Sequence, residues 1–398
     1  MNRNCRANPL LANQEVVAMS DEVIQLRGTD FDECMDFLNE VFSEHAPHDF
    51  AGMLPSIYQP TDEQMACNYA IRVDGKLAAV VGLFPAQWQV GDQVLKVGGI
   101  GGVSTHKRVR GAGYMKTLMN HCVGVMQEEQ YHLSWLGGQR QRYGYFGYET
   151  CGVSTNMSLS PTNLRHALPE TAITFSPIEA DDDRSLTFAH RLHTHQSVHC
   201  QRPADVFHRF LVGGFRTPYL ARDETDTVIG YLVARRGEVT EWVAEDDDHA
   251  IVMAGAWVRD RGEQANFWLM PTQTGLAQRL GALAESTVIR TSGNWQVFDW
   301  AATIGALLQV QAAEQGLPDG RVRFGIEGYG ALEIDVENDW VCCRRTEASA
   351  SVVWHPFEAM RALFGPLPAH MVVNVSPELS ALHGWCPLPL GWSHQDYV

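Results

Sequence analysis

The chain has no long hydrophobic run and no excess of positive charge. No window approaches eighteen consecutive apolar residues, so we expect no transmembrane helix. Lys and Arg number 30 against 47 Asp and Glu, which gives a formal net charge of −17. This argues against a nucleic-acid binder, because that binding depends on phosphate neutralisation. Residues 1–11 lack the apolar segment of a secretory signal. We therefore expect a cytoplasmic protein that binds neither membrane nor nucleic acid.

Cysteine pairs and metal-ligand spacings are also scarce. The nine cysteines are an odd number and form no CxxC pair, so we expect reduced thiols. A group of histidines precedes a cysteine and suggests zinc: His190, His193, His195, His199 and Cys200. The stronger interpretation is a helix with exposed histidines, since the spacing is helical and no carboxylate is interleaved. We expect no metal.

Two phosphate-binding patterns are missing from the glycine-rich stretch 98–114. It has no Gly-Lys followed by Ser or Thr, and Lys116 stands where a dinucleotide fingerprint needs its third glycine. What is present is Arg108-x-x-Gly111-x-Gly113 between an apolar strand and a helix start. Glycines let backbone N–H groups approach phosphate oxygens, and a helix N-terminus favours the same anion. The stretch therefore predicts a diphosphate-binding loop, with a plain strand-to-helix turn as the alternative.

The flanking pattern supports a binding loop. Apolar residues recur at helical spacing over 112–126, and a short buried strand is expected at 132–136. Tyr143 then precedes Gly147-Tyr148 by four residues. Upstream, an Asp-Gly turn at 74–75 joins two predicted strands.

The loop and Tyr143, in this order and spacing, resemble the acyl-coenzyme A site of the GNAT acyltransferase superfamily. The whole chain looks like the Eis (enhanced intracellular survival) family within it. The resemblance implies an α/β (α+β) fold of tandem GNAT-like domains followed by a sterol-carrier-protein-like α+β domain. We expect a loose tail over 1–20, an active domain over 21–155, a degenerate one over 156–290, and a C-terminal domain over 291–398 whose end docks at the active site.

The resemblance also implies roles for individual residues. Gly101, Gly102 and Val103 align with backbone partners of pantetheine. The diphosphate loop falls on Val109, Arg110, Gly111, Ala112, Gly113 and Tyr114, with Arg108 beside it. Relatives often carry a second arginine where this chain has Val109, and Arg110 is a possible replacement. Tyr143 aligns with the general acid, and the C-terminal carboxylate of Val398 aligns with the base.

The function implied is an N-acetyltransferase that moves an acetyl group from acetyl-CoA to a primary amine through a ternary complex. Aminoglycosides, polyamines and lysine side chains are the acceptor classes, and a homo-oligomer, commonly a hexamer, is the implied assembly. The loop 44–63 is expected on the acceptor side. Two alternatives stay open. One is a non-catalytic protein that binds acyl-CoA or an apolar ligand. The other is a transferase for longer acyl chains, limited by bulk such as Trp135 and Phe84.

Overall fold

The computed structural model describes residues 22–43 and 47–398. The expected tail over 1–20, and His45 of the predicted acceptor-side loop, lie outside these residues. Within the described ranges, no helix is both long enough and apolar enough to cross a bilayer. The described residues form three sheets, which confirms the expected α/β class with GNAT-like domains.

The first sheet has eight strands, and its central path runs β1-β2-β3-β4-β5-β15-β6, with β9 paired to β3. The strands are β1 (Ile24–Gln25), β2 (Asn68–Val73), β3 (Lys76–Val90), β4 (Gln93–Thr105), β5 (Leu133–Leu136), β6 (Glu149–Cys151), β9 (Val198–Cys200) and β15 (Gly293–Val297). The meander β2-β3-β4 is antiparallel, and its first turn places Asp74 and Gly75 at positive φ, as the Asp-Gly pair predicts. Strands β4 and β5 are parallel.

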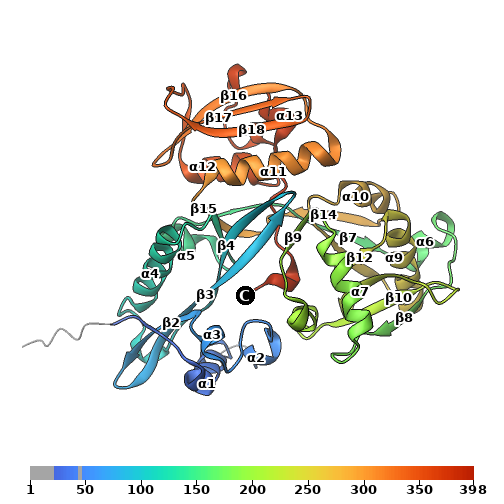
Figure 1. The fold of residues 1–398 in the computed structure, drawn as a ribbon, viewed down its shortest axis with the longest axis horizontal. Helices are drawn as coiled ribbons and strands as arrows, with labels where there is room; N and C mark the ends of the chain where they lie inside the picture. The colour runs from blue at the N-terminus through green and yellow to red at the C-terminus, as the bar shows by residue number, and fades with distance from the viewer. Residues whose placement is uncertain (1–21, 44–46) are drawn as a thin grey trace, which may run out of the picture.

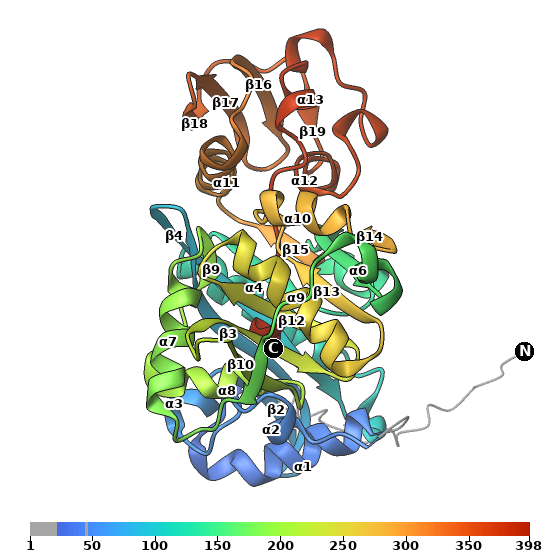
Figure 2. The same ribbon diagram turned by 90° about the vertical axis from the view of Figure 1, so that its right-hand side faces the viewer.

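Helices cover both faces of this sheet (Figures 1 and 2). They are α1 (Phe31–Phe42), α2 (Phe50–Met53), α3 (Asp62–Met65), α4 (Tyr114–Glu128) and α5 (Arg140–Tyr143). Helix α4 buries Leu118, Met119 and Cys122 on one side, at the helical spacing expected from the sequence. Helix α1 buries Cys34, Phe37 and Leu38 in a separate cluster. The two clusters place α1 and α4 on opposite faces of the sheet.

The second sheet has seven strands in the order β14-β7-β13-β12-β11-β10-β8. Its elements are β7 (Ser154–Leu159), α6 (Pro161–Ala167), β8 (Thr174–Pro177), α7 (Asp183–Thr194), α8 (Phe207–Leu211), β10 (Thr217–Arg222), β11 (Val228–Arg235), β12 (Glu238–Ala244), α9 (Asp247–Arg261), β13 (Ala265–Leu269), α10 (Thr274–Gly281) and β14 (Ser286–Arg290). A meander, then a helix, then a parallel strand repeats the plan of the first sheet. Strand β7 and helix α6 are the first elements of this part of the chain.

The C-terminal part has a four-stranded sheet in the order β18-β17-β16-β19. Its elements are α11 (Trp300–Gln315), β16 (Gly320–Ile326), β17 (Gly330–Glu337), β18 (Trp340–Thr346), β19 (Val353–Trp354), α12 (Pro356–Phe364) and α13 (Leu382–Trp385). Helix α12 begins and ends at the residues expected from Pro356 and Gly365. These elements stand above the other two parts of the molecule in Figure 1.

Two strands cross the domain boundaries proposed from the sequence. Strand β15 was placed with the C-terminal domain, beyond residue 291, but it lies between β5 and β6 in the first sheet. Strand β9, inside the proposed second domain, pairs with β3. Local pattern predicts that a strand exists, but not which sheet edge receives it. The first sheet is therefore built from three separate parts of the chain.

The last twelve residues return to the centre of the molecule. In Figure 1 the C-terminus lies between the first domain, in blue and cyan, and the second, in green and yellow. A short 3-10 helix, η7 (His394–Asp396), contacts β12 and α8 of the second domain. Val398 packs with clusters of the first domain. The tail thus joins both domains at its very end.

Candidate active site

The glycine-rich strand β4 separates from β5 in the middle of the first sheet. The parallel pairing runs from Val97 with Leu133 to Ile100 with Leu136 and stops there. On its other side β4 stays paired with β3, with a register shift between Gly82 and Val80. Gly102 at this irregularity has φ +57°, a backbone that favours glycine. Beyond Ile100 the pairing of β4 with β5 therefore ends, and Val103, Ser104 and Thr105 of β4 line an open groove.

The loop after β4 has the backbone predicted for anion binding. Gly111 and Gly113 have φ of +91° and +89°, and a Cβ added at either would meet nothing within 4 Å. Gly113 is the N-cap of α4. The first N–H groups of α4 have no partner inside the helix, and they carry the positive end of its dipole. The loop therefore offers an open cradle of donors for a diphosphate.

An open groove of about 1060 Å³ runs beside this cradle. Its lining combines the end of β4, the loop, the start of α4, the end of α1 and the segment after α5: Val41, Phe42, Val103, Ser104, Thr105, Arg110, Gly111, Gly113, Tyr114, Met115, Lys116, Arg142, Tyr145 and Phe146. Five of the residues predicted to bind the cofactor are in this set, namely Val103, Arg110, Gly111, Gly113 and Tyr114. The groove lining combines three basic side chains, Arg110, Lys116 and Arg142, with apolar and aromatic ones, which suits an anionic nucleotide joined to a pantetheine arm.

The other predicted cofactor residues lie near the groove without lining it. Arg108 turns to the sheet and donates from Nη2 to the carbonyl of Leu77 at 2.9 Å. Its own N–H donates to His106 Nδ1. Val109 belongs to the 3-10 turn before the loop, and Ala112 is exposed between the two glycines. In this structure Arg108 fixes the loop to the sheet, and Arg110 is the arginine that lines the groove.

The C-terminal residue lies against the glycines of β4. A Cβ at Gly101 would be 2.6 Å from the carboxyl carbon of Val398, and one at Gly99 would be 2.9 Å from Val398 Cγ2. A Cβ at Gly98 would instead meet Met126 of α4 on the opposite face. The glycines at 99 and 101 are therefore required for the tail to approach the strand. The terminal carboxyl group lies at the point where β4 leaves β5.

Aromatic rings hold the tail to the first sheet. Tyr397 packs on Trp135 of β5 with ring centroids 4.7 Å apart, and Trp392 stacks on the same indole at 5.8 Å. Trp392 also contacts Trp88 and Trp295, and its Nε1 donates to the carbonyl of Asp396 at 2.9 Å. Trp135, which the sequence suggested as a limit on acyl length, is 2% exposed and covered by the tail.

A buried arginine holds the tail to the second domain. Arg202 is fully buried and donates to both carboxylate oxygens of Glu241 on β12, at 2.9 and 2.8 Å. It also donates to both oxygens of Asp396 in the tail, at 2.7 and 3.0 Å. This charge lowers the pKa of Glu241 to about 2 despite its burial. Two carboxylates and one guanidinium therefore form one hydrogen-bonded network.

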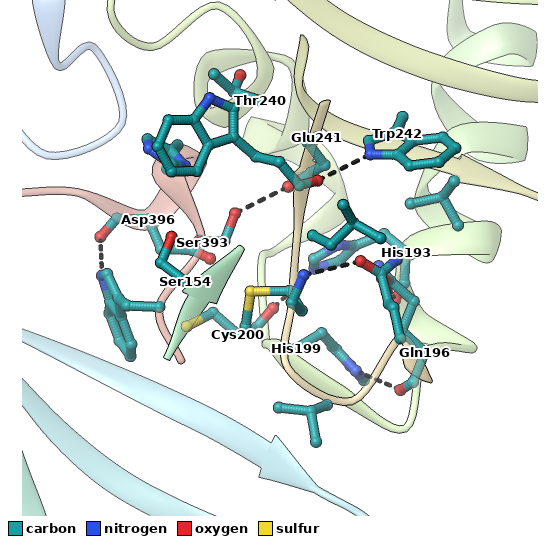
Figure 3. A pocket seen from close by; sticks show the side chains of 18 of the residues that line it. Ser154, His193, Gln196, His199, Cys200, Thr240, Glu241, Trp242, Ser393 and Asp396 are labelled. Carbon is teal, nitrogen blue, oxygen red and sulfur yellow. Dashed lines mark hydrogen bonds between the residues drawn. The ribbon is translucent and has the colours of Figure 1, made fainter. Parts of the chain in front are cut away.

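A small cavity lies beside this network. Figure 3 shows Ser393 and Glu241 joined by a hydrogen bond near Asp396, with the side chains of the α7–β9 segment opposite: His193, Gln196, His199 and Cys200. Gln395 adds further contacts to the second domain, since its Nε2 donates to the carbonyls of Phe210 and Leu211. Its Oε1 accepts from Thr240 at 2.8 Å.

The histidines suggested as zinc ligands have other roles in the structure. His193 Nε2 bonds the Cys200 carbonyl and His190 Nε2 bonds the Arg202 carbonyl, both at 2.8 Å. Burial lowers the pKa of His193 to about 3. Among the described residues, no three His, Cys, Asp or Glu side chains are arranged to hold a metal ion. These histidines support the segment that leads to Arg202.

Tyr143 ends α5 and is 6% exposed. Its ring packs under Gly138, where a Cβ would lie 2.9 Å from Cε2, and φ of +114° at Gly138 favours glycine. Burial raises the pKa of Tyr143 above its ordinary value, although Arg142 opposes the shift. The hydroxyl is therefore protonated at neutral pH. Tyr143 does not line the groove, but its neighbours Arg142, Tyr145 and Phe146 do.

The second sheet repeats the splayed strands without the anion cradle. β12 and β13 pair in parallel at only two positions, Glu238 with Asn266 and Val239 with Phe267. Four consecutive acidic residues span the start of α9: Glu245 and Asp246 precede the helix, and Asp247 and Asp248 are its first two residues. Asp246 accepts from the His249 N–H and occupies the helix N-terminus. A diphosphate would meet several carboxylates here, so the second domain is unsuited to coenzyme A.

Sequence reasoning missed several residues of the site. Tyr145 is 90% exposed on the groove, and Phe42, Lys116 and Arg142 also line it. The basic residues and the unusual aromatic density around 142–146 were available as signals. No sequence signal indicated a role for Arg202, because an isolated arginine in a loop is usually exposed. Only the fold brings it to Asp396.

Comparison with known proteins agrees with the first domain. Residues 22–151 match the family described as acetyltransferase (GNAT) domain. This confirms the expected class: the chain contains an acetyltransferase domain, and the groove and loop described above lie within it. A 71-residue stretch is also 31% identical to threonylcarbamoyl-AMP synthase of Pseudomonas fluorescens (strain Pf0-1). That match spans 18% of this chain and only 38% of the synthase.

Solved structures show the same fold over nearly the whole chain. A probable N-acyltransferase of Enterococcus faecalis V583 aligns with TM-score 0.67 and 12% identity, over 95% of this chain and 99% of that one. A GCN5-related N-acetyltransferase of Kribbella flavida aligns with TM-score 0.65 and 16% identity, over 95% and 98%. Eis1 of Mycobacterium abscessus aligns with TM-score 0.62 and 12% identity, over 95% and 100%. At these identities the likeness establishes the fold.

We predict that Gly101→Ala displaces the tail from β4. The new methyl group would overlap the Val398 carboxyl group, so the tail must move while the core of the sheet stays intact. The C-terminus should become more sensitive to carboxypeptidase. Gly124→Ala is the matched control, since a Cβ there meets nothing within 4 Å. Equal digestion rates for wild type, Gly101→Ala and Gly124→Ala would contradict the packing described.

We predict that Arg202→Met destabilises the protein strongly. It leaves Glu241 and Asp396 buried without a counter-charge, a change that costs about 3–5 kcal/mol. The midpoint of urea unfolding, followed by tryptophan fluorescence, should fall. Arg191→Met removes the exposed ion pair with Glu245 and should change the midpoint little, because solvent screens an exposed pair. Similar midpoints for the two variants would show that the Arg202 network contributes little.

Proposed function

We propose that this protein is an acetyl-CoA-dependent N-acetyltransferase of Eis type that acetylates a primary amine in a ternary complex. The observation that supports this best is the meeting of three features at one point. The anion cradle lies on the groove, the groove reaches β4 at Val103, and the C-terminal carboxyl group of Val398 lies two residues earlier on β4, against Gly101, where β4 leaves β5. The acceptor classes, a homo-oligomer such as a hexamer, a cytoplasmic location and the sterol-carrier likeness remain proposals from the Eis resemblance.

The coenzyme would bind with its diphosphate at Gly111 and Gly113 and its pantetheine along Gly101 to Val103. The thioester carbonyl would then lie at the strand, where the Val103 N–H can stabilise the oxyanion of the tetrahedral intermediate. The basic side chains of the groove, Arg110, Lys116 and Arg142, would hold the phosphates. The second domain would bind no coenzyme and would instead hold the tail.

The terminal carboxylate of Val398 would remove a proton from the acceptor amine, directly or through water, because the amine must be neutral to attack. The nitrogen–carbon bond forms and the carbon–sulfur bond breaks. Tyr143 would donate a proton to the departing thiolate. Its buried hydroxyl stays protonated at neutral pH, which suits an acid rather than a base. No covalent enzyme intermediate is needed.

The first experiment is thiol release from acetyl-CoA across a panel of amines, beside a thermal shift with acetyl-CoA alone. We expect both stabilisation by the cofactor and release of thiol with at least one amine. Stabilisation without release for every amine would favour a non-catalytic acyl-CoA-binding protein. Longer acyl-CoA donors in the same assay test whether the site accepts more than acetyl.

We predict that Tyr143→Phe keeps cofactor binding and loses most turnover. Removing a general acid typically costs a factor of about 100 or more, while the phenyl ring preserves packing under Gly138. Steady-state kinetics and a thermal shift with acetyl-CoA measure the two properties. Turnover equal to wild type would remove Tyr143 from the mechanism.

We predict that one glycine added after Val398 impairs catalysis and spares the fold. The extension moves the carboxylate away from the splay, whereas the Arg202 network and the stacking of Tyr397 remain. The kcat should fall about tenfold or more, with unchanged acetyl-CoA binding. A conservative control is Val398→Ile, which keeps the terminal carboxylate in register. Wild-type rates in the extended protein would exclude the terminal carboxylate as the base.

A further inference from the structure

Tyr58 lies between α2 and α3, beneath the surface that faces the tail. Its side chain is fully buried. It packs edge-on against Phe50 and Phe84, with ring centroids 5.8 and 5.6 Å away. The same apolar cluster includes Leu38 of α1 and is contacted by Val398. The aromatic ring therefore has an ordinary core environment.

The hydroxyl group of Tyr58, in contrast to its ring, is in an unusual environment. Among the described residues, no group lies in hydrogen-bonding position to Tyr58 Oη. A buried polar atom without a partner is costly, and such atoms call for an explanation in a native structure. The hydroxyl points at the irregular part of β4, because a Cβ at Gly102 would lie 2.7 Å from Tyr58 Oη. Gly102 thus leaves room for this hydroxyl.

The direction of approach places Tyr58 on the same face of β4 as the tail. Positions 99 and 101 face Val398, and position 102, at positive φ, faces Tyr58 and Leu38. Position 98 faces α4 on the other side. Tyr58 Oη and the Val398 carboxyl group therefore flank two consecutive glycines on one face, at the point where the strands separate.

We propose that the Tyr58 hydroxyl is a further catalytic group of this site, which contacts the attacking amine of the acceptor and orients it beside the Val398 carboxylate. This inference rests on the proposed acetyl transfer. The hydroxyl oxygen accepts a hydrogen bond from an N–H of the amine, which directs the nitrogen lone pair to the thioester carbon. An amine on this face supplies the hydrogen-bond partner that the described residues do not.

Tyr58 orients the amine and does not take its proton. Burial raises the pKa of its hydroxyl well above the ordinary value, so the phenol stays neutral throughout. The amine proton goes to the Val398 carboxylate, and the thiolate is protonated by Tyr143. The Tyr58 hydroxyl therefore has the same protonation state before and after the reaction.

Tyr58→Phe tests this role because it removes one oxygen and keeps the ring. We expect kcat/KM for the amine to fall about tenfold or more, the size of one lost hydrogen bond in the transition state. Binding of acetyl-CoA should be unchanged. The melting temperature should be unchanged or higher, since the lost hydroxyl bonds none of the described residues.

The matched control is Tyr148→Phe. Tyr148 is equally buried, but its hydroxyl bonds Ser134 Oγ at 2.7 Å, so its loss should lower the melting temperature. A Tyr58→Phe enzyme with wild-type kcat/KM, or with a lowered melting temperature like that of Tyr148→Phe, would overturn the proposal and make Tyr58 structural. Failure of the wild type to acetylate any amine would instead overturn the proposed function, and with it this role.

Discussion

The arrangement of this molecule depends on one buried cation. Arg202 holds Glu241 of the second domain and Asp396 of the C-terminal tail at the same time. A guanidinium suits this position because its planar set of donors can meet two carboxylates at once, and it does not lose its charge on burial. Such a network is strongly favoured only when it is complete. It therefore fixes the tail in one register, and that register sets where Val398 ends.

The glycines of β4 are the second feature that positions the C-terminal tail. They leave the backbone of β4 open on the side of β5. They also leave space on one face of β4 in which the tail lies. Any side chain at position 99 or 101 would occupy the space of Val398. The aromatic contacts of Trp135 with Trp392 and Tyr397 then bury the tail along β5. The site is thus assembled from the first domain and from a chain end nearly 300 residues away.

The two sheets are similar, but the segments that lead into α4 and α9 differ in charge. The first presents basic residues and two left-handed glycines before α4, and the second presents four consecutive acidic residues across the start of α9. The same splay of parallel strands remains in both. In the second domain the neighbouring surface of β12 holds the tail through Thr240 and Glu241. The glycine loop before α4 and the docking surface for the tail on β12 therefore lie in different domains.

The sequence by itself determined the local features. The glycine spacing at 111 and 113, the amphipathic α4 and the Asp-Gly hairpin each follow from short-range sterics and periodicity, and the structure has them where they were expected. Tertiary structure alone decided what is brought together from a distance. Residues that share no local pattern, such as Arg202 with Asp396, Tyr58 with Gly102, and β15 with β5, meet only when separate segments pack. The physical reason is that periodicity specifies which face of an element is buried, whereas the partner on that face is chosen by the packing of the whole chain.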